Sequence, residues 1–172
     1  MIKYKNVCLE QRIPSHVKDW RNDPDIRRWC RQTGLITWQH HENWLKRIEQ
    51  PDIQMFGIAK DYAIGESENC VGVCGLTSID MTHRKAEFSF YIAPEYQGQG
   101  YASNALRALL KYAFDELGLN IVWGEVIDEN PALALFERLG FKREGSCRER
   151  YFKEGKIWDS HMISVKKDEV VW

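Results

Sequence analysis

Long hydrophobic runs, an excess of charge of either sign and a regular cysteine spacing are all lacking in this chain of 172 residues. Its 24 Lys and Arg nearly balance 25 Asp and Glu, so composition gives no argument for a nucleic-acid partner or an anionic membrane surface. The first residues form no apolar signal core, and no stretch is apolar for long enough to span a bilayer. We therefore expect a cytoplasmic protein that binds neither nucleic acid nor membrane.

The five cysteines are odd in number and irregularly spaced, which argues against a disulfide framework. Cys70 and Cys74 would share one face of a strand, but four ligands at zinc spacing are lacking. Buried reduced thiols are the better interpretation, and Cys147 lacks the histidine and acid pattern that would activate a nucleophile. We expect no metal.

The order of elements predicts one α/β (α+β) domain over residues 1–172, with no internal repeat or linker. A mixed, mostly antiparallel sheet of about seven strands with helices on both faces would bury these elements. The expected strands are residues 3–9, 55–59, 70–79, 85–93, 121–127, 142–152 and 158–165. Helices are expected from a cap at Ser15 to Trp20, over 26–30, after a cap at Thr37, over about 102–117, and after Pro131.

A loop with two glycines, Gly98 and Gly100, joins the strand that ends near Pro94 to the next helix. The first backbone N–H groups of a helix lack partners and lie at the positive end of its dipole, so the loop is a candidate anion site. An ordinary strand-to-helix turn is the alternative. The loop lacks the Gly-Lys-Ser/Thr ending of a nucleotide P-loop and the three-glycine dinucleotide fingerprint. Residues 97–102 do match Gln/Arg-x-x-Gly-x-Gly/Ala.

That pattern resembles the pyrophosphate loop of the GNAT superfamily of N-acetyltransferases. A second match supports the resemblance: residues 122–126 and 128–141 are similar to the fifth strand and fourth helix of the family. Residues 20–24 and 143–146, with Trp158 and Asp159, resemble the branch that includes ribosomal-protein N-terminal acetyltransferases. The resemblance implies the GNAT fold, with acetyl-coenzyme A as cosubstrate.

The resemblance also implies where the cofactor lies. The backbone of the loop would hold the pyrophosphate, and the pantetheine arm would lie between the strand ending at Ile92 and the strand over 121–127. Asn130 matches a family asparagine near that arm, with a helix N-cap before Pro131 as the alternative; its spacing to Gly140 is one residue short of the common pattern. The expected cofactor-binding residues are Tyr91, Ile92, Gln97, Gly98, Gln99, Gly100, Tyr101, Ala102, Ser103, Asn130 and Phe136.

Acetyl transfer to an amine needs a neutral nitrogen and a proton for the leaving thiolate. Glu125 is the first candidate for general base, because it matches a glutamate of some ribosomal-protein N-acetyltransferases; a structural carboxylate paired with arginine is its alternative role. Glu87 is the second candidate. Phe136 stands where the family often has a tyrosine acid, and phenylalanine cannot donate a proton. Tyr91, Tyr151 and departure of the thiolate without an acid remain open.

The function implied is transfer of acetyl to a primary amine, on a protein N-terminus or a small amine such as an amino sugar, by direct attack in a ternary complex. We expect a monomer or homodimer. The missing tyrosine keeps a non-catalytic coenzyme A-binding sensor as the alternative. The N-terminal helices and the closing strands should form the acceptor site, with Trp29, Trp38, Tyr151 and Trp158 as candidate walls.

Overall fold

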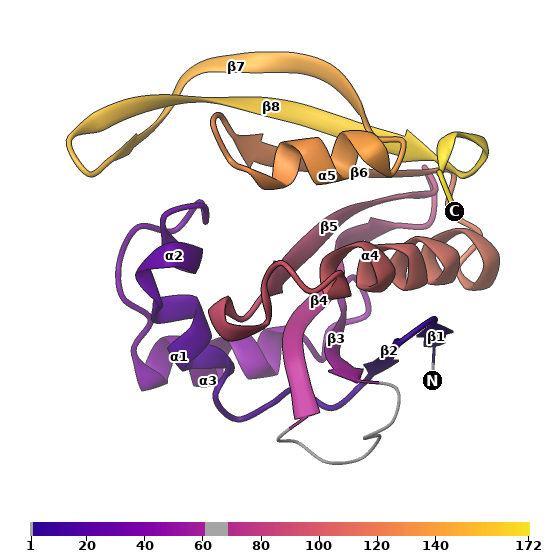
Figure 1. The fold of residues 1–172 in the computed structure, drawn as a ribbon, viewed down its shortest axis with the longest axis horizontal. Coiled ribbons are helices and arrows are strands. Elements are labelled where there is room, and N and C mark those ends of the chain that lie inside the picture. The colour runs from indigo at the N-terminus through magenta and orange to yellow at the C-terminus, as the bar shows by residue number, and fades with distance from the viewer. Residues whose placement is uncertain (1, 61–68) are drawn as a thin grey trace.

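The computed structural model describes residues 2–60 and 69–172, whose strands form one eight-stranded sheet in the order β1-β2-β3-β4-β5-β6-β8-β7 (Figure 1). All neighbouring strands are antiparallel except the parallel pair β5 and β6. The fold class is confirmed, with one strand more than expected in the sheet. The strands are β1 (Ile2–Tyr4), β2 (Val7–Glu10), β3 (Gln54–Lys60), β4 (Cys70–Asp80), β5 (Lys85–Ile92), β6 (Ile121–Ile127), β7 (Lys142–Lys153) and β8 (Lys156–Lys166).

The extra strand arises because residues 3–9 are not one strand but most of a tight hairpin. Lys5 takes a φ of 50°, and Tyr4 pairs with Val7 across the turn. The alternation of polar and apolar residues there predicts extended backbone, but nothing in Lys5-Asn6 marked the turn strongly enough to divide the segment.

Helices lie on both faces of the sheet. On one face, α4 and α5 enclose the larger core, which includes Leu106, Leu109 and Phe136. On the other face, Val17, Trp20 and Ile26 of α1 and α2 pack against strand residues, with Trp44 of α3 beside them. The helices are α1 (Val17–Asn22), α2 (Pro24–Arg27), α3 (Trp38–Arg47), α4 (Tyr101–Lys111), which continues as a π-helical turn over Tyr112–Glu116, and α5 (Ala132–Arg138).

The caps of the N-terminal helices follow their side chains, with one correction. Thr37 caps α3 as predicted, accepting a hydrogen bond from the His40 backbone N–H at 3.2 Å. The predicted cap at Ser15 is wrong, because the N-cap of α1 is His16 and its side chain makes no capping bond. Asp23 accepts from the Asp25 backbone N–H at 2.8 Å and starts α2, in which proline occupies the first position.

The sheet opens between β5 and β6. These strands pair only over Lys85–Glu87 and Ile121–Trp123, and beyond those positions each pairs only with its other neighbour. The next residue of β5 is Phe88, and a Cβ atom on Gly124 of β6 would overlap its ring. The ring therefore occupies the vertex of the opening, packed on Phe136 with 5.0 Å between ring centroids.

The hairpin of β7 and β8 extends past the sheet and reaches over α2 (Figure 1). Lys153, near its tip, is buried and donates hydrogen bonds to the carbonyl oxygens of Arg28 at 2.8 Å, Arg27 at 3.2 Å and Cys30. This lysine fixes the hairpin to the segment that follows α2. Because that segment carries Trp29 and Arg31, the contact also positions two side chains of the site described next.

Candidate active site

The predicted anion loop has the backbone that its glycines permit. Gly98 and Gly100 have φ values of 73° and 81°, which side chains rarely adopt, and no atom lies within 4 Å of the position of either missing Cβ. Gly100 is the N-cap of α4 and brings no capping side chain. Within the described chain, the backbone N–H groups of residues 98–100 donate no hydrogen bond. The loop thus offers unpaired donors and open space at the positive end of a helix dipole.

The polar side chains of the loop hold its shape. Gln97 Nε2 donates to the Ile92 carbonyl at 3.1 Å, and Gln99 Nε2 donates to the Glu95 carbonyl at 3.0 Å. Ser103 Oγ donates to the Gly100 carbonyl at 3.0 Å. An anion here would therefore be bound through the backbone, which a glycine pattern can predict.

A cleft of about 490 Å³ runs from this loop into the opening beside β5. We call it the donor cleft, because the resemblance would place the acetyl donor there. Gln99 and Ser103 belong to the loop and the first turn of α4 but do not line the cleft. The sequence-predicted residues that do line it are Tyr91, Ile92, Gln97, Gly98, Gly100, Tyr101, Ala102, Asn130 and Phe136.

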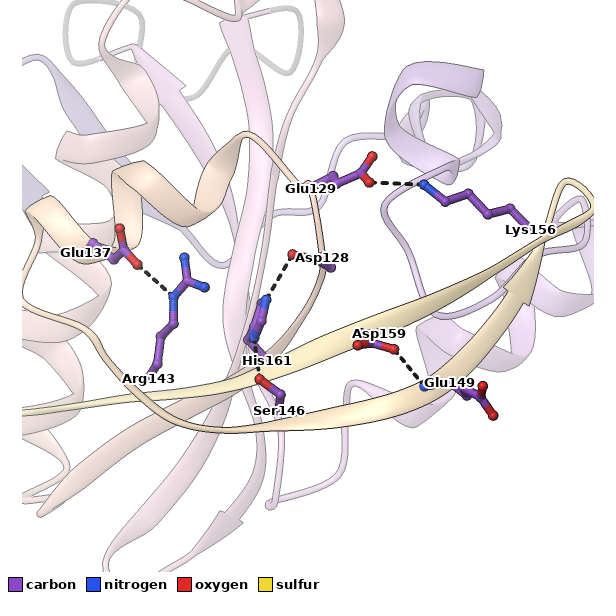
Figure 2. Close-up of polar contacts among 9 residues, drawn as sticks. All are labelled: Asp128, Glu129, Glu137, Arg143, Ser146, Glu149, Lys156, Asp159 and His161. Carbon is purple, nitrogen blue, oxygen red and sulfur yellow. Dashed lines mark hydrogen bonds and ion pairs between the residues drawn. The ribbon is translucent and has the colours of Figure 1, made fainter.

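Asn130 lines this cleft while also organising the start of α5. Its Oδ1 accepts a hydrogen bond from the backbone N–H of Ala132, the first residue of α5, at 2.9 Å, although Pro131 rather than Asn130 is the N-cap of that helix. The turn before it is held from outside by His161, whose Nε2 lies 2.9 Å from Asp128 Oδ1 and whose Nδ1 lies 3.0 Å from Ser146 Oγ. Figure 2 shows the His161 ring between these two side chains. The hydrogen bond with His161 is the main cause that lowers the pKa of Asp128. None of these three outer residues lines the donor cleft or the acceptor cleft described next.

An acceptor cleft of about 390 Å³ adjoins the donor cleft. Its walls come from α1, α3, the segment after α2, β5 and β6. The residues that line both clefts, and so mark where they meet, are Trp29, Cys30, Phe90, Tyr91, Asn130 and Phe136.

Glu87 lies on the wall of the acceptor cleft, with 9% of its side chain exposed. Its Oε1 is ion-paired with Arg31, whose own side chain is about half exposed. The pKa of Glu87 is raised, chiefly by burial, because burial and the charge of the neighbouring Glu125 together outweigh the lowering by Arg31. Arg31 thus reaches into the cleft from the segment that follows α2.

Glu125 faces the same cleft from β6 with 6% of its side chain exposed. Burial alone raises the pKa of Glu125, but hydrogen bonds from Ser160 and Tyr151 and the charge of Arg150 together outweigh it, and the net shift is downward. Ser160 Oγ and Arg150 Nε donate to Oε1 at 2.6 Å and 3.2 Å. The pairing with arginine weighed as an alternative for Glu125 is present.

The two candidate tyrosines differ in surroundings. Tyr151 lines neither cleft, and its hydroxyl interacts with Glu125 and Arg150. Tyr91 lines both clefts, and its buried hydroxyl has no hydrogen-bond partner among the described residues. Burial raises the pKa of Tyr91, so its hydroxyl keeps its proton at neutral pH.

Of the four tryptophan and tyrosine walls predicted, Trp29 alone lines the clefts, and Trp158 packs edge-on against it at 6.2 Å. Trp38 is 63% exposed. Sequence reasoning missed Lys18 and Arg21 of α1, which also line the acceptor cleft. Their spacing of three residues on a helix was the available signal, since it places both on one face.

Residues 2–60 and 69–172 contain neither a metal-binding cluster nor a helix that could span a membrane. No group of three or more His, Cys, Asp or Glu side chains in this part of the chain is arranged to hold a metal ion. Among the helices described there, none is long and apolar enough to cross a membrane.

The opened sheet, with unpaired helix-terminal donors beside it and a second cleft adjoining it, is the arrangement that the resemblance to N-acetyltransferases implies. The family model described as "Acetyltransferase (GNAT) domain" matches residues 8–142, and the chain belongs to this family. It is an acetyl-coenzyme A-dependent N-acetyltransferase that transfers acetyl to an amine. The predicted superfamily, fold and cosubstrate are thereby confirmed.

Individual relatives agree. The structure of spermidine N-acetyltransferase from Vibrio cholerae in complex with CoA and spermine superposes with a TM-score of 0.85 at 25% identity, over 95% of this chain and 97% of that one. The V. cholerae spermidine N(1)-acetyltransferase sequence is 40% identical over 93 residues, which is 54% of each chain. An uncharacterised N-acetyltransferase of Bacillus licheniformis, p20, is 28% identical over 151 residues, covering 86% of this chain and 84% of p20.

Proposed function

We propose that this enzyme acetylates a primary amine, on a protein N-terminus or a small amine such as an amino sugar, by direct attack in a ternary complex. The observation that carries the proposal is the shared lining of the two clefts, which would let donor and acceptor meet between Tyr91, Asn130 and Phe136. Positioning of two reactants in one complex supplies much of the rate of such a transfer.

The residues present fit acetyl-coenzyme A, which supplies an acetyl group activated as a thioester. The unpaired N–H groups of residues 98–100 suit a pyrophosphate. Beyond their last shared pair, the edges of β5 and β6 suit hydrogen bonds with the amides of the pantetheine arm, in the way that a sheet edge pairs with an added strand. The apolar rings of Phe90 and Phe136 line the path between them.

For the proton of the amine, we propose Glu87 as general base, ahead of Glu125. A base works best when its pKa is close to the working pH and when an oxygen is available. Glu87 has a raised pKa, and within residues 2–60 and 69–172 only its Oε1 is engaged, by Arg31, which leaves Oε2 available. Glu125 has a lowered pKa and is held by three donors. In this proposal Glu87 Oε2 takes the proton, and Glu125 organises Arg150 and Tyr151.

For the leaving sulfur, we propose Tyr91 as the hydrogen-bond donor in place of the tyrosine that Phe136 replaces. Its hydroxyl is buried, protonated and unpartnered among the described residues, at the lining shared by both clefts. Tyr151 is the alternative donor, and its engagement with Glu125 speaks against it.

The test is release of free thiol from acetyl-coenzyme A across a panel of peptides with free N-termini, amino sugars, amino acids and polyamines. Turnover of at least one amine, with loss of turnover when its amine is blocked, is expected. Binding of acetyl-coenzyme A with no turnover of any amine would contradict the proposal and favour the sensor. Membership of the ribosomal-protein branch and a cytoplasmic location stay predictions. A monomer or homodimer is also still a prediction, and a relative differs from it, since the V. cholerae spermidine N-acetyltransferase has a dodecameric structure.

A further inference from the structure

The charges that line the acceptor cleft are Glu87 and Glu125 against Lys18, Arg21 and Arg31. Each carboxylate already has a cationic partner. Glu87 Oε1 pairs with Arg31, and its Oε2 is assigned to the reacting amine, while Glu125 accepts from Arg150 and Ser160. In the described lining, no carboxylate is left for a second ammonium group of a substrate. The charge that remains in the cleft is positive.

Arg21 carries that remaining charge. Its Nη1 contacts Cys30 Sγ, and its guanidinium lies 5.8 Å from the centre of the Tyr91 ring. None of the ion pairs in the described chain includes Arg21, although a guanidinium suits the paired oxygens of a carboxylate or phosphate. A thiol is a weak acceptor, which an anion would readily replace.

Lys18 extends the same basic face of α1, three residues before Arg21. Among the described residues, its Nζ forms an ion pair with the neighbouring Asp19 at 2.8 Å and lies 4.7 Å from the centre of the Trp38 ring. Asp19 is 69% exposed on its side chain, so water screens that pair. Two cations with little compensation thus lie on one wall of the cleft.

We propose that the natural acceptor carries an anionic group, a carboxylate or a phosphate, on the same molecule as its amine, and that Arg21 with Lys18 binds it. The inference rests on the proposed function and specifies its substrate class. Arg21 adjoins Tyr91, which lines both clefts, so an anion at Arg21 leaves the amine of the same molecule close to the donor. A polyamine, the ligand of the V. cholerae relative, would meet the wrong charge here.

The experiment compares amines that differ only in their second group. Propylamine, β-alanine and 1,3-diaminopropane share a three-carbon chain with a neutral, anionic or cationic end, and ethanolamine is matched by O-phosphoethanolamine. Peptides beginning Ser-Glu and Ser-Lys extend the comparison to a protein N-terminus. Since a charged hydrogen bond contributes more than a neutral one, we expect kcat/KM to favour the anionic member by about tenfold or more. Comparison of kcat/KM for β-alanine with that for O-phosphoethanolamine then shows whether the site prefers a carboxylate or a phosphate.

Variants assign the preference to its residues. Arg21→Met should remove the preference for the anionic amine, so that the ratio of kcat/KM for β-alanine to kcat/KM for propylamine falls to about one. Arg21→Lys should retain part of the preference. Lys46→Met, on α3 and outside both clefts, controls for loss of a nearby positive charge. The assignment would be overturned if kcat/KM for 1,3-diaminopropane equalled or exceeded that for β-alanine. An equal loss of kcat/KM for all amines in Arg21→Met would also overturn it.

A binding measurement separates this inference from the transfer itself. Calorimetry compares N-acetyl-β-alanine with N-propylacetamide, which differ by the carboxylate. Preference for the anionic product, abolished in Arg21→Met, supports the anion site even if no amine is turned over, and the proposed transfer alone would then fail. Equal binding of the two products would overturn the anion site, whatever the outcome of the transfer assay.

Discussion

The two clefts are built from different parts of the chain. The donor cleft takes its recognition from backbone: unpaired N–H groups of one loop and two strand edges that diverge. The acceptor cleft takes its character from side chains contributed by α1, α3, β5 and β6. A backbone site needs only that certain side chains be small, whereas a side-chain site needs several distant residues to coincide. The first is common to a family, and the second can differ between its members.

The largest expected effect separates chemistry on the acceptor side from binding on the donor side. Glu87→Gln should lower kcat by about 100-fold or more, the range of a lost general base, with little change in KM for acetyl-coenzyme A. Because a base must be deprotonated, wild-type activity should fall as pH drops through the raised pKa of Glu87, and the variant should lose that limb. Steady-state kinetics against pH measure both.

The matched variant is Glu125→Gln, which changes the other carboxylate of the same cleft. A larger loss of kcat in Glu125→Gln than in Glu87→Gln would restore the order that the sequence suggested. Thermal melting of both variants verifies that the fold persists.

An intermediate effect is expected on the donor side. Gly100→Ala puts a side chain at a φ of 81° and a methyl group into the open space of the anion loop. We expect KM for acetyl-coenzyme A to rise about tenfold, with a loss of about 1–2 kcal/mol of folding free energy from the left-handed backbone. Titration of the cosubstrate and chemical denaturation check the two parts.

Gly118→Ala is the control, because Gly118 has a φ of 66° and equally open surroundings at the other end of the same helical segment. It should lose similar stability and leave KM unchanged. A similar rise of KM in both variants would mean that strain, rather than the ligand, accounts for the effect.

The smallest expected effect tests the connection between the hairpin and the acceptor wall. Lys153→Met leaves the carbonyl groups of Arg27, Arg28 and Cys30 without this donor. We expect about 1–3 kcal/mol less stability, with KM for the amine raised a few-fold and KM for acetyl-coenzyme A unchanged. Arg148→Met, an exposed cation on β7, should change neither constant. A rise in KM for acetyl-coenzyme A alone would contradict the prediction, because Lys153 would then act on the donor cleft and not on the acceptor cleft.

The same contrast explains how much could be predicted from the sequence. The loop, the strand after α4 and the cap at Thr37 depend on neighbouring residues, and each was predicted at its place. The ion pair of Arg31 with Glu87 joins positions 56 residues apart, and Lys153 reaches carbonyl groups more than 120 residues away. No local pattern encodes such contacts. The predicted cap at Ser15 is wrong because the N-cap of α1 is His16, one residue later.

The opening in the sheet depends on the absence of a side chain at Gly124, which leaves room for the Phe88 ring. A larger side chain there would push Phe88 toward α5 and strain the core, whereas removal of the Phe88 ring would leave a cavity against Phe136 and Phe141. The absent side chain of one strand and the large ring of the other are therefore a matched pair. A substitution at either position is expected to change the stability of the core and the shape of the opening together.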